Sequence, residues 1–298
     1  MAKLQYVQMA TFSLQDHNSF KSIEVAPFTQ RSFQKTQVES SQFSVPCHMT
    51  ISILRSKLAQ LILSGLILLF LGCARIKDLK HSKEGNALNL SRKGLTEFPE
   101  EAFLNKDLRV LRLYGNEIDS IPDRISELVN LEKLYLGRNN LKYLPATIGE
   151  LKNLKILQVQ YNQLESLPEE LSEMTSLEQL WLNQNDLRSL PQSLGNLKNL
   201  EVLQVKYNQL DSIPNSIGDC ESLKFIHLNR NNLLSLPKSM AKLSSLKELY
   251  LAGAGPLLDV PEEMCDLRYF ELIQIDRNTA LPPCMYVLQA NRLQIVVN

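Results

Sequence analysis

Residues 131–153 read LEKLYLGRNNLKYLPATIGELKN, and residues 154–176 read LKILQVQYNQLESLPEELSEMTS. Both follow the pattern LxxLxLxxNxLxxLPxxIxxLxx, with an apolar residue at each L or I position. Proline recurs once per repeat from Pro99 to Pro237, and so does asparagine, at Asn116, Asn139, Asn162, Asn185, Asn208 and Asn231. A fixed period of about 20–29 residues is typical of a solenoid, in which each repeat forms one coil.

The LxL segment of each repeat predicts a short strand. Side chains alternate along a strand, so Leu134 and Leu136 point inward while Tyr135 points outward. One coil cannot bury its own apolar face, and stacked coils must therefore share a core beneath a parallel sheet. The inward asparagine would pair with backbone groups that are otherwise buried without partners. Proline, which has no N–H, suits the irregular convex side.

On these residues the chain resembles the leucine-rich-repeat family in its 23-residue form, over roughly residues 85–298. The resemblance implies an α/β solenoid. This would be a horseshoe of about nine coils, with a parallel β-sheet on the concave face and short turns or 3-10 segments on the convex face. It also implies that the six asparagines form a structural ladder, and that the concave face is the binding surface.

The terminal repeats depart from the pattern and are expected to be caps. Lys93 takes the asparagine position in the first repeat and Ala254 takes it in the eighth, before an extra residue in the stretch Gly253–Pro256. The last unit has Asn278 but reaches its prolines early. Cys265 and Cys284 flank this unit, and exported members of the family sometimes hold their C-terminal cap with a disulfide; the sequence leaves the pairing open.

Three segments precede the repeats. Residues 1–48, rich in Gln, Ser and Thr, are expected to be disordered or to reflect a start assigned too early, since Met49 stands where an initiator would. Residues 49–73 have a basic start and then a short apolar run, the layout of a signal peptide. Residues 74–84 form a charged linker.

The apolar run ends in Leu71-Gly72-Cys73, which resembles a lipobox of the loose form found in spirochaete lipoproteins, with Cys73 as the acylated residue. Leu71 departs from the small residue that is usual at its position. The alternatives are an uncleaved anchor and a buried apolar helix with an incidental cysteine. The run is shorter than the roughly 20 residues that a spanning helix prefers.

Composition and motifs argue against catalysis. Lys plus Arg and Asp plus Glu each number 32, so net charge predicts no affinity for nucleic acid. The four histidines are scattered, and only His227 lies in a repeat, without metal ligands at a suitable spacing. Phosphate-binding loops and nucleophile motifs are missing. We expect no enzyme activity, cofactor, metal or small-molecule substrate. Cys220 fills a leucine position and is expected to be a small buried residue.

The outward strand positions define a candidate partner-binding face. Tyrosine, tryptophan and arginine are enriched in binding hot spots. The position between the two inward residues carries Arg112, Tyr135, Gln158, Trp181, Gln204, His227, Tyr250 and Gln274. Neighbouring positions carry Tyr114, Arg138, Tyr161, Lys206, Tyr207 and Arg230. The alternative is that these side chains only cover the sheet and stabilise their cross-strand neighbours.

These features favour an exported protein, anchored in a membrane of the cell envelope by lipid on Cys73, that binds a protein partner of unknown identity through its concave face. The alternative is a cytoplasmic signalling scaffold, because LPxxIxxL repeats of this length also resemble the Ras-associated leucine-rich-repeat proteins. A spacer that binds nothing is disfavoured by the aromatic and basic residues on the outward positions.

Replacing Cys73 with Ser is expected to move the protein from the detergent phase to the aqueous phase in detergent partition. Several acyl chains bury many CH₂ groups at about 0.8 kcal/mol each, and the variant would lose all of them. The intact mass of the wild-type protein from its own cell should show Cys73 acylated at the N-terminus. An unchanged partition, or a mature chain that still contains residues 1–48, would contradict the prediction.

Overall fold

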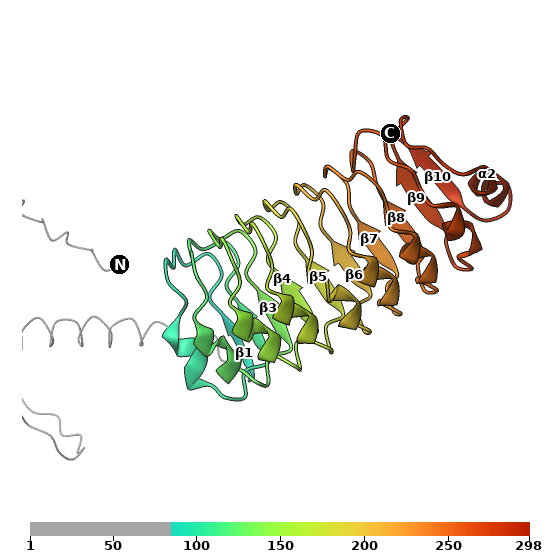
Figure 1. The fold of residues 1–298 in the computed structure, drawn as a ribbon. Coiled ribbons are helices and arrows are strands. Elements are labelled where there is room, and N and C mark those ends of the chain that lie inside the picture. The colour runs from blue at the N-terminus through green and yellow to red at the C-terminus, as the bar shows by residue number, and fades with distance from the viewer. Residues whose placement is uncertain (1–84) are drawn as a thin grey trace, which may run out of the picture. The chain divides into compact units, whose positions relative to one another are not determined.

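The computed structural model describes residues 85–298, so the expected signal peptide, Cys73 and linker lie outside the described residues. Within this range, ten strands form one parallel sheet in strict chain order. Figure 1 shows them stacked along the domain, with short helical turns in a second row. The strands are β1 (Ala87–Asn89), β2 (Val110–Arg112), β3 (Lys133–Tyr135), β4 (Ile156–Gln158), β5 (Gln179–Trp181), β6 (Val202–Gln204), β7 (Phe225–His227), β8 (Glu248–Tyr250), β9 (Leu272–Ile275) and β10 (Gln294–Val297).

The second row consists of 3-10 helices and one α-helix. They are η3 (Glu100–Leu104), η4 (Asp123–Glu127), η5 (Ala146–Glu150), η6 (Glu169–Glu173), η7 (Leu194–Asn196), η8 (Asn215–Asp219), η9 (Lys238–Lys242), η10 (Glu262–Asp266) and α2 (Pro283–Gln289). A proline precedes each 3-10 helix except η7, where Ser193 takes that position. The expected solenoid, with its sheet on one face and 3-10 segments on the other, is confirmed.

Strand register follows the repeat. Leu134 of β3 pairs with Leu157 of β4, and Leu157 pairs with Leu180 of β5, so equivalent side chains stack directly. These leucines are fully buried, whereas the residues on either side of each are only partly buried. The alternation places a continuous apolar core on one face of the sheet and a column of outward side chains on the other.

Small residues let neighbouring 3-10 helices approach closely. A Cβ added to Gly218 of η8 would lie 2.1 Å from the Ser239 carbonyl oxygen of η9, and one added to Gly149 of η5 would lie 2.2 Å from that of Glu170. Contacts this short are not tolerated between these atoms, so any side chain there would push the coils apart. The sequence analysis did not anticipate this constraint.

The six repeating asparagines are buried and bridge successive coils. Asn185 shows the arrangement: its Oδ1 accepts the backbone N–H of Leu164 at 3.1 Å in the preceding coil. Its Nδ2 donates to the carbonyl oxygens of Val159, 3.1 Å away in the preceding coil, and of Leu182, 2.9 Å away in its own coil. Each asparagine bonds at least three backbone groups in this way, most of which the core would otherwise leave without partners.

The asparagine ladder ends at Asn231, and backbone groups take over in the next coil. Where an asparagine would bond, the Ala254 carbonyl accepts the N–H of Leu233 at 2.7 Å, and the Ala254 N–H donates to Leu251 at 2.8 Å. The chain can pass this close to Leu233 only because residue 255 is glycine. A Cβ on Gly255 would lie 1.9 Å from the Leu233 carbonyl oxygen. The bulge lengthens the repeat, so Leu249 pairs with Ile273, one residue later than elsewhere.

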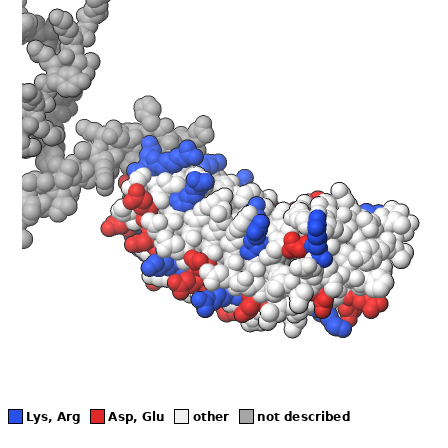
Figure 2. Space-filling model, turned by 90° about the horizontal axis from the view of Figure 1, so that it is seen from above, with Lys and Arg blue, Asp and Glu red and all other residues white. Residues whose placement is uncertain are grey.

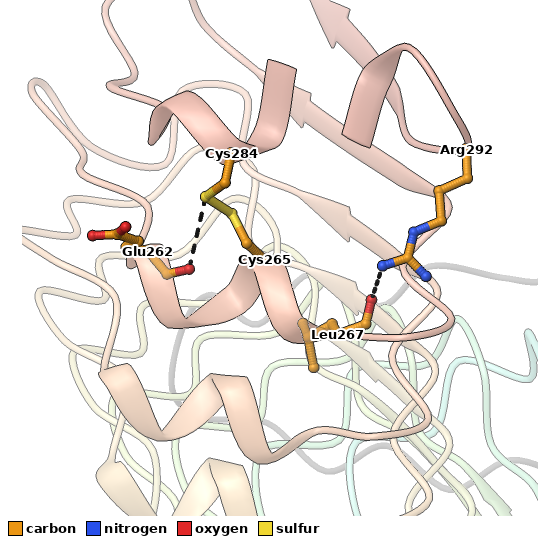
Figure 3. Close-up of a disulfide and its surroundings, with 5 residues drawn as sticks. All are labelled: Glu262, Cys265, Leu267, Cys284 and Arg292. Carbon is orange, nitrogen blue, oxygen red and sulfur yellow. Dashed lines mark hydrogen bonds between the residues drawn. A yellow bond between two sulfur atoms is a disulfide. The ribbon is translucent and has the colours of Figure 1, made fainter. Parts of the chain in front are cut away.

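Different contacts stabilise the two ends of the described domain. At the first coils the rings of Phe98 and Phe103 pack 5.6 Å apart, with the Arg124 guanidinium 4.4 Å above Phe103. At the other end a disulfide joins Cys265 of η10 to Cys284 of α2. Arg292 donates to the carbonyl oxygen of Leu267 at 2.7 Å, a second link between the end of the chain and the residues of the preceding coil (Figure 3).

The C-terminal cap contains a strand that the sequence analysis did not expect. The estimate of about nine coils stops before β10, because the residues of this strand carry no repeat motif. Asn278, which holds the asparagine position in the last unit with a motif, is exposed and does not extend the buried ladder. After α2, the chain returns to pair Ile295 with Ile273 of β9. Across residues 85–298, no helix combines the length and apolar character needed to cross a membrane.

Replacing Asn231 with Ala is expected to lower the free energy of unfolding by at least 1–3 kcal/mol, roughly the cost of one buried polar group without a partner. The change removes the bonds to Leu210, Val205 and Leu228. The adjacent Asn232 is exposed, so Asn232→Ala is the matched control and should stay within about 0.5 kcal/mol of wild type. Urea unfolding measures both. Equal midpoints would show that the ladder does not carry stability.

Candidate functional site

The residues between the two inward positions of each strand form a column along the concave face, here called the central column. Its members are all partly buried: Arg112, Tyr135, Gln158, Trp181, Gln204, His227, Tyr250 and Gln274. Parallel register places Trp181 between Gln158 and Gln204. The structure thus brings together every residue of this column that the sequence analysis proposed. At a strand spacing of about 4.8 Å, the column gives a face on the order of 40 Å long.

A second column begins where the chain leaves each strand. Every residue that directly precedes the ladder position has a positive φ, between 54° and 72°: Arg92, Gly115, Arg138, Tyr161, Gln184, Tyr207, Arg230 and Gly253. We call this the left-handed column. Glycine adopts this conformation freely, but a side chain costs about 1–2 kcal/mol there. All of its non-glycine members are nevertheless exposed.

Backbone bonds hold the left-handed column in place. The N–H of Tyr161 donates to the carbonyl oxygen of Asn183 at 2.8 Å, and that of Tyr207 donates to Asn229 at 2.9 Å. The ladder asparagine then follows and turns inward. The sequence analysis did not predict the positive φ, because Arg and Tyr are not residues that favour this conformation. The available signal is that two other coils have a glycine, Gly115 or Gly253, at the equivalent position.

Aromatic and basic side chains on this face contact one another across coils. The Arg112 guanidinium lies 5.5 Å from the ring centroid of Tyr135, and that of Arg138 lies 4.9 Å from Tyr161. Such cation–π pairs contribute about 0.5–1 kcal/mol at exposed sites and restrict the side chains. The rings of His227 and Tyr250 stack 4.3 Å apart, with planes only 5° from parallel. The side chains are therefore partly ordered before any partner binds.

A third outward column was missed. It occupies the first position of each strand, before the inward leucine, and in the middle of the sheet it carries Ile156, Gln179, Val202 and Phe225, all partly buried. Residue register places Gln179 between Ile156 and Val202, next to Trp181 on the same strand. The same alternation of side chains that identified Trp181 could have found this column. It widens the apolar area around Trp181.

Trp181 combines partial exposure with an unsatisfied polar atom. Its indole Nε1 is buried and, among the described residues, has no hydrogen-bond acceptor. Gln160, one coil earlier, has a buried Oε1 without a donor. Gly137 leaves room for this glutamine, since a Cβ there would meet both Gln160 and Tyr114 at 3.1 Å. Both unpaired atoms lie beneath the surface of the central face.

His227 and Tyr250 share a perturbed environment. Burial lowers the pKa of the His227 imidazole, with a further lowering from the nearby charge of Lys206. The Tyr250 hydroxyl donates to Glu248 at 2.6 Å, and this bond raises the pKa of Tyr250 to about 12. Both rings are therefore neutral at pH 7, and the pair presents a stacked uncharged surface.

The remaining sequence-based expectations concern chemistry. Cys220 is fully buried in the core, where desolvation raises its pKa to about 12, so it packs as a small apolar residue. Within residues 85–298, no group of three or more His, Cys, Asp or Glu side chains is placed to hold a metal ion. On the convex side, the Glu169 carboxylate accepts hydrogen bonds from the backbone N–H groups of Gln192 and Ser193, and so links η6 to the next coil.

Comparison with known proteins agrees with the repeat geometry. Residues 104–214 match the profile of the leucine-rich repeat region family. The described domain is a leucine-rich-repeat solenoid. Comparison with curated proteins finds no match.

Solved structures extend the likeness over most of the domain. A leucine-rich-repeat protein of Leptospira interrogans is 28% identical with a TM-score of 0.65, over 75% of this chain and 63% of that one. The ectodomain of the Arabidopsis thaliana receptor kinase GASSHO1/SCHENGEN3, in complex with CASPARIAN STRIP INTEGRITY FACTOR 2, is 30% identical with a TM-score of 0.55, over 62% and 23%. The plant peptide hormone receptor RGFR1, in complex with RGF2, is 25% identical with a TM-score of 0.60, over 68% and 34%. The chain therefore spans less than two thirds of each, and the resemblance to a spirochaete protein is confirmed at the level of the fold.

Because burial lowers the pKa of His227, the unfolded chain binds the proton more tightly than the folded leucine-rich-repeat domain does. The stability that the neutral ring contributes is present above the ordinary pKa of about 6.5 and is lost as pH falls through the lower folded value. We expect His227→Gln to lose less stability than wild type between pH 7.5 and pH 5. Urea unfolding at both pH values measures the difference; identical pH dependence would contradict the prediction.

Proposed function

We propose that the leucine-rich-repeat domain is a non-catalytic module that binds a protein or peptide partner through its concave face. The observation that carries the proposal is the set of Tyr, Trp and Arg side chains gathered on this face, with Trp181 and Tyr135 in the central column and Arg138, Tyr161, Tyr207 and Arg230 in the left-handed column. The non-glycine residues of the left-handed column are both strained and exposed. The fold imposes this conformation, and glycine would adopt it without strain, as Gly115 and Gly253 do. The exposed Arg and Tyr side chains at the other positions therefore need a reason beyond the fold.

The concave face is better suited to bind a protein or peptide than to hold a small-molecule substrate. It is an open sheet lined by partly buried side chains, with Trp181 near the middle and an apolar surround of Ile156, Val202 and Phe225. Hot spots have this form, a central aromatic residue ringed by contacts that exclude water. Two structural relatives are receptors solved in complex with RGF2 and with CASPARIAN STRIP INTEGRITY FACTOR 2, which supports the same use of the fold here. The fold is typically a non-enzymatic interaction module.

We further propose that the protein is exported and anchored to a membrane by acyl chains on Cys73. The lipobox-like Leu71-Gly72-Cys73 supports this. The disulfide between Cys265 and Cys284 adds support, because disulfides persist in oxidising compartments and are rare in the cytosol. The same bond weighs against the cytoplasmic signalling scaffold as an alternative.

Trp181→Ala is expected to weaken partner binding by more than tenfold, since truncating a central aromatic anchor typically costs at least about 2 kcal/mol. The experiment captures partners on the immobilised domain from a native extract, identifies the dominant one by mass spectrometry and measures its affinity when purified. The variant should still unfold cooperatively in urea, because Trp181 lies on the outer face of β5 and not in the core.

Tyr143→Ala supplies the matched control. Tyr143 is 60% exposed and lies outside the strands, on the segment between the sheet and η5, so it loses a ring of similar size away from the concave face. We expect it to bind as wild type does. Normal binding by Trp181→Ala together with weak binding by Tyr143→Ala would show that the partner uses another surface.

A further inference from the structure

Charge is segregated on the concave face although the chain as a whole is neutral. Three columns matter: the central column, the left-handed column, and between them the exit column, which consists of Tyr114, Gly137, Gln160, Asn183, Lys206 and Asn229. From Arg92 to Gly253 these columns carry five basic residues and no Asp or Glu: Arg92, Arg112, Arg138, Lys206 and Arg230. Two carboxylates lie at the border of this area near its C-terminal end, Glu248, which accepts from the Tyr250 hydroxyl, and Asp276, which accepts from the N–H of Gly253. With 32 basic and 32 acidic residues in the chain, an even mixture would have placed carboxylates among them.

These five basic side chains have no ion-pair partners in the described domain. All eight ion pairs found in residues 85–298 lie elsewhere, between the loops before the strands or among the 3-10 helices. In Figure 2 acidic and basic side chains are interleaved along one edge of the domain, while the opposite edge carries mainly basic ones. Arg138 and Arg230 are exposed, and Arg138 is already held against Tyr161.

From this arrangement we infer that the concave face binds an acidic, extended protein segment that runs across the strands, with carboxylates at Arg138 and at Lys206 or Arg230 and an apolar side chain over Trp181. The inference rests on the proposed function and specifies the chemistry of the partner. Arginine pairs well with carboxylates, and a charge-assisted bond to an ordered guanidinium is stronger than a neutral one.

The spacing of the basic side chains sets the spacing of the acidic ones. Arg138 follows β3, while Lys206 and Arg230 follow β6 and β7. At about 4.8 Å per strand these separations are roughly 14 and 19 Å, which an extended chain spans in about four and six residues at ~3.4 Å each. Trp181 of β5 lies between them. The partner segment should therefore carry two carboxylates four to six residues apart, on either side of an apolar residue.

A protein segment fits the face better than another polyanion does. Between the basic positions the columns carry Gln158, Gln184 and Gln204, whose amides match the donors and acceptors of a peptide backbone. Asn183 is buried and holds Gln204 in place by donating to its Oε1 at 2.7 Å. A uniformly charged polymer would leave these groups and the apolar column of Ile156 and Val202 unused.

Three synthetic peptides test the inference: ESGLGSE, its neutral analogue QSGLGSQ and its basic analogue KSGLGSK, each with blocked termini. Trp181 is the only tryptophan of the chain, so its fluorescence reports binding on this face directly. We expect ESGLGSE to bind at least about tenfold more tightly than QSGLGSQ at low salt, and the difference to shrink as screening increases.

A second experiment reverses the charge of two basic residues on the concave face. Arg138→Glu combined with Arg230→Glu should abolish the preference for ESGLGSE and favour KSGLGSK. Lys142→Glu combined with Arg188→Glu makes the same change in net charge at two exposed positions outside the three columns, and neither residue takes part in an ion pair of the described domain. This control should keep the wild-type preference, and urea unfolding should show that both variants fold.

Several outcomes would overturn the inference. These are equal affinity for the acidic and neutral peptides, no binding of ESGLGSE at millimolar concentration, and loss of the preference in the Lys142/Arg188 control. Tighter binding of a heparin fragment than of ESGLGSE, dependent on Arg138 and Arg230, would assign the face to another class of polyanion. Partner capture that depends on Trp181 but not on Arg138 and Arg230 would leave the proposed function standing while the acidic specificity fails.

Discussion

The hydrogen bonds of the inward asparagines are the interaction on which the rest of the structure depends. Each coil leaves its strand through a turn whose backbone faces the core, where water cannot satisfy it. Asn185 supplies an acceptor to Leu164 and donors to Val159 and Leu182, and so closes its own turn while fixing the coil before it. Repetition of this bond from Asn116 to Asn231 keeps the repeat length constant and the leucines in register. The coil after Asn231 keeps two of these three bonds with backbone atoms of Ala254, an acceptor for the N–H of Leu233 and a donor to Leu251.

The ladder also makes the proposed binding face possible. To turn the asparagine inward, the residue before it must adopt a positive φ, at about 1–2 kcal/mol when it is not glycine. The asparagine bonds and the backbone bond from Tyr161 to Asn183 offset that strain. In return Arg138, Tyr161, Tyr207 and Arg230 project from fixed positions beside the sheet. A partner that binds them needs to immobilise little of the domain, which lowers the entropic cost of binding.

The solenoid and its central column could be predicted from the sequence because the residues that determine them recur at a fixed period. Period-two alternation within LxL fixed which side chains face outward, and so found Trp181 and Tyr135 as members of one column. The same logic, applied one position earlier, would have found Ile156 and Val202. Features without a period were harder. Strand β10 has no repeat motif and is placed by its pairing with β9 after α2. The pairing of Cys265 with Cys284 depends on how the cap returns to η10.

The amino-acid sequence was enough to establish the solenoid, its register and the neutral overall charge, because leucine, asparagine and proline recur at fixed positions of the interior repeats. Which charged residues pair with one another became clear only from the stacked coils. Arg92, Arg138 and Arg230 are far apart in the chain. Only the stacked coils show that none of the three forms an ion pair in the described domain. The left-handed conformation of these residues is likewise invisible locally, because neighbouring coils impose it through hydrogen bonds that join one repeat to the next.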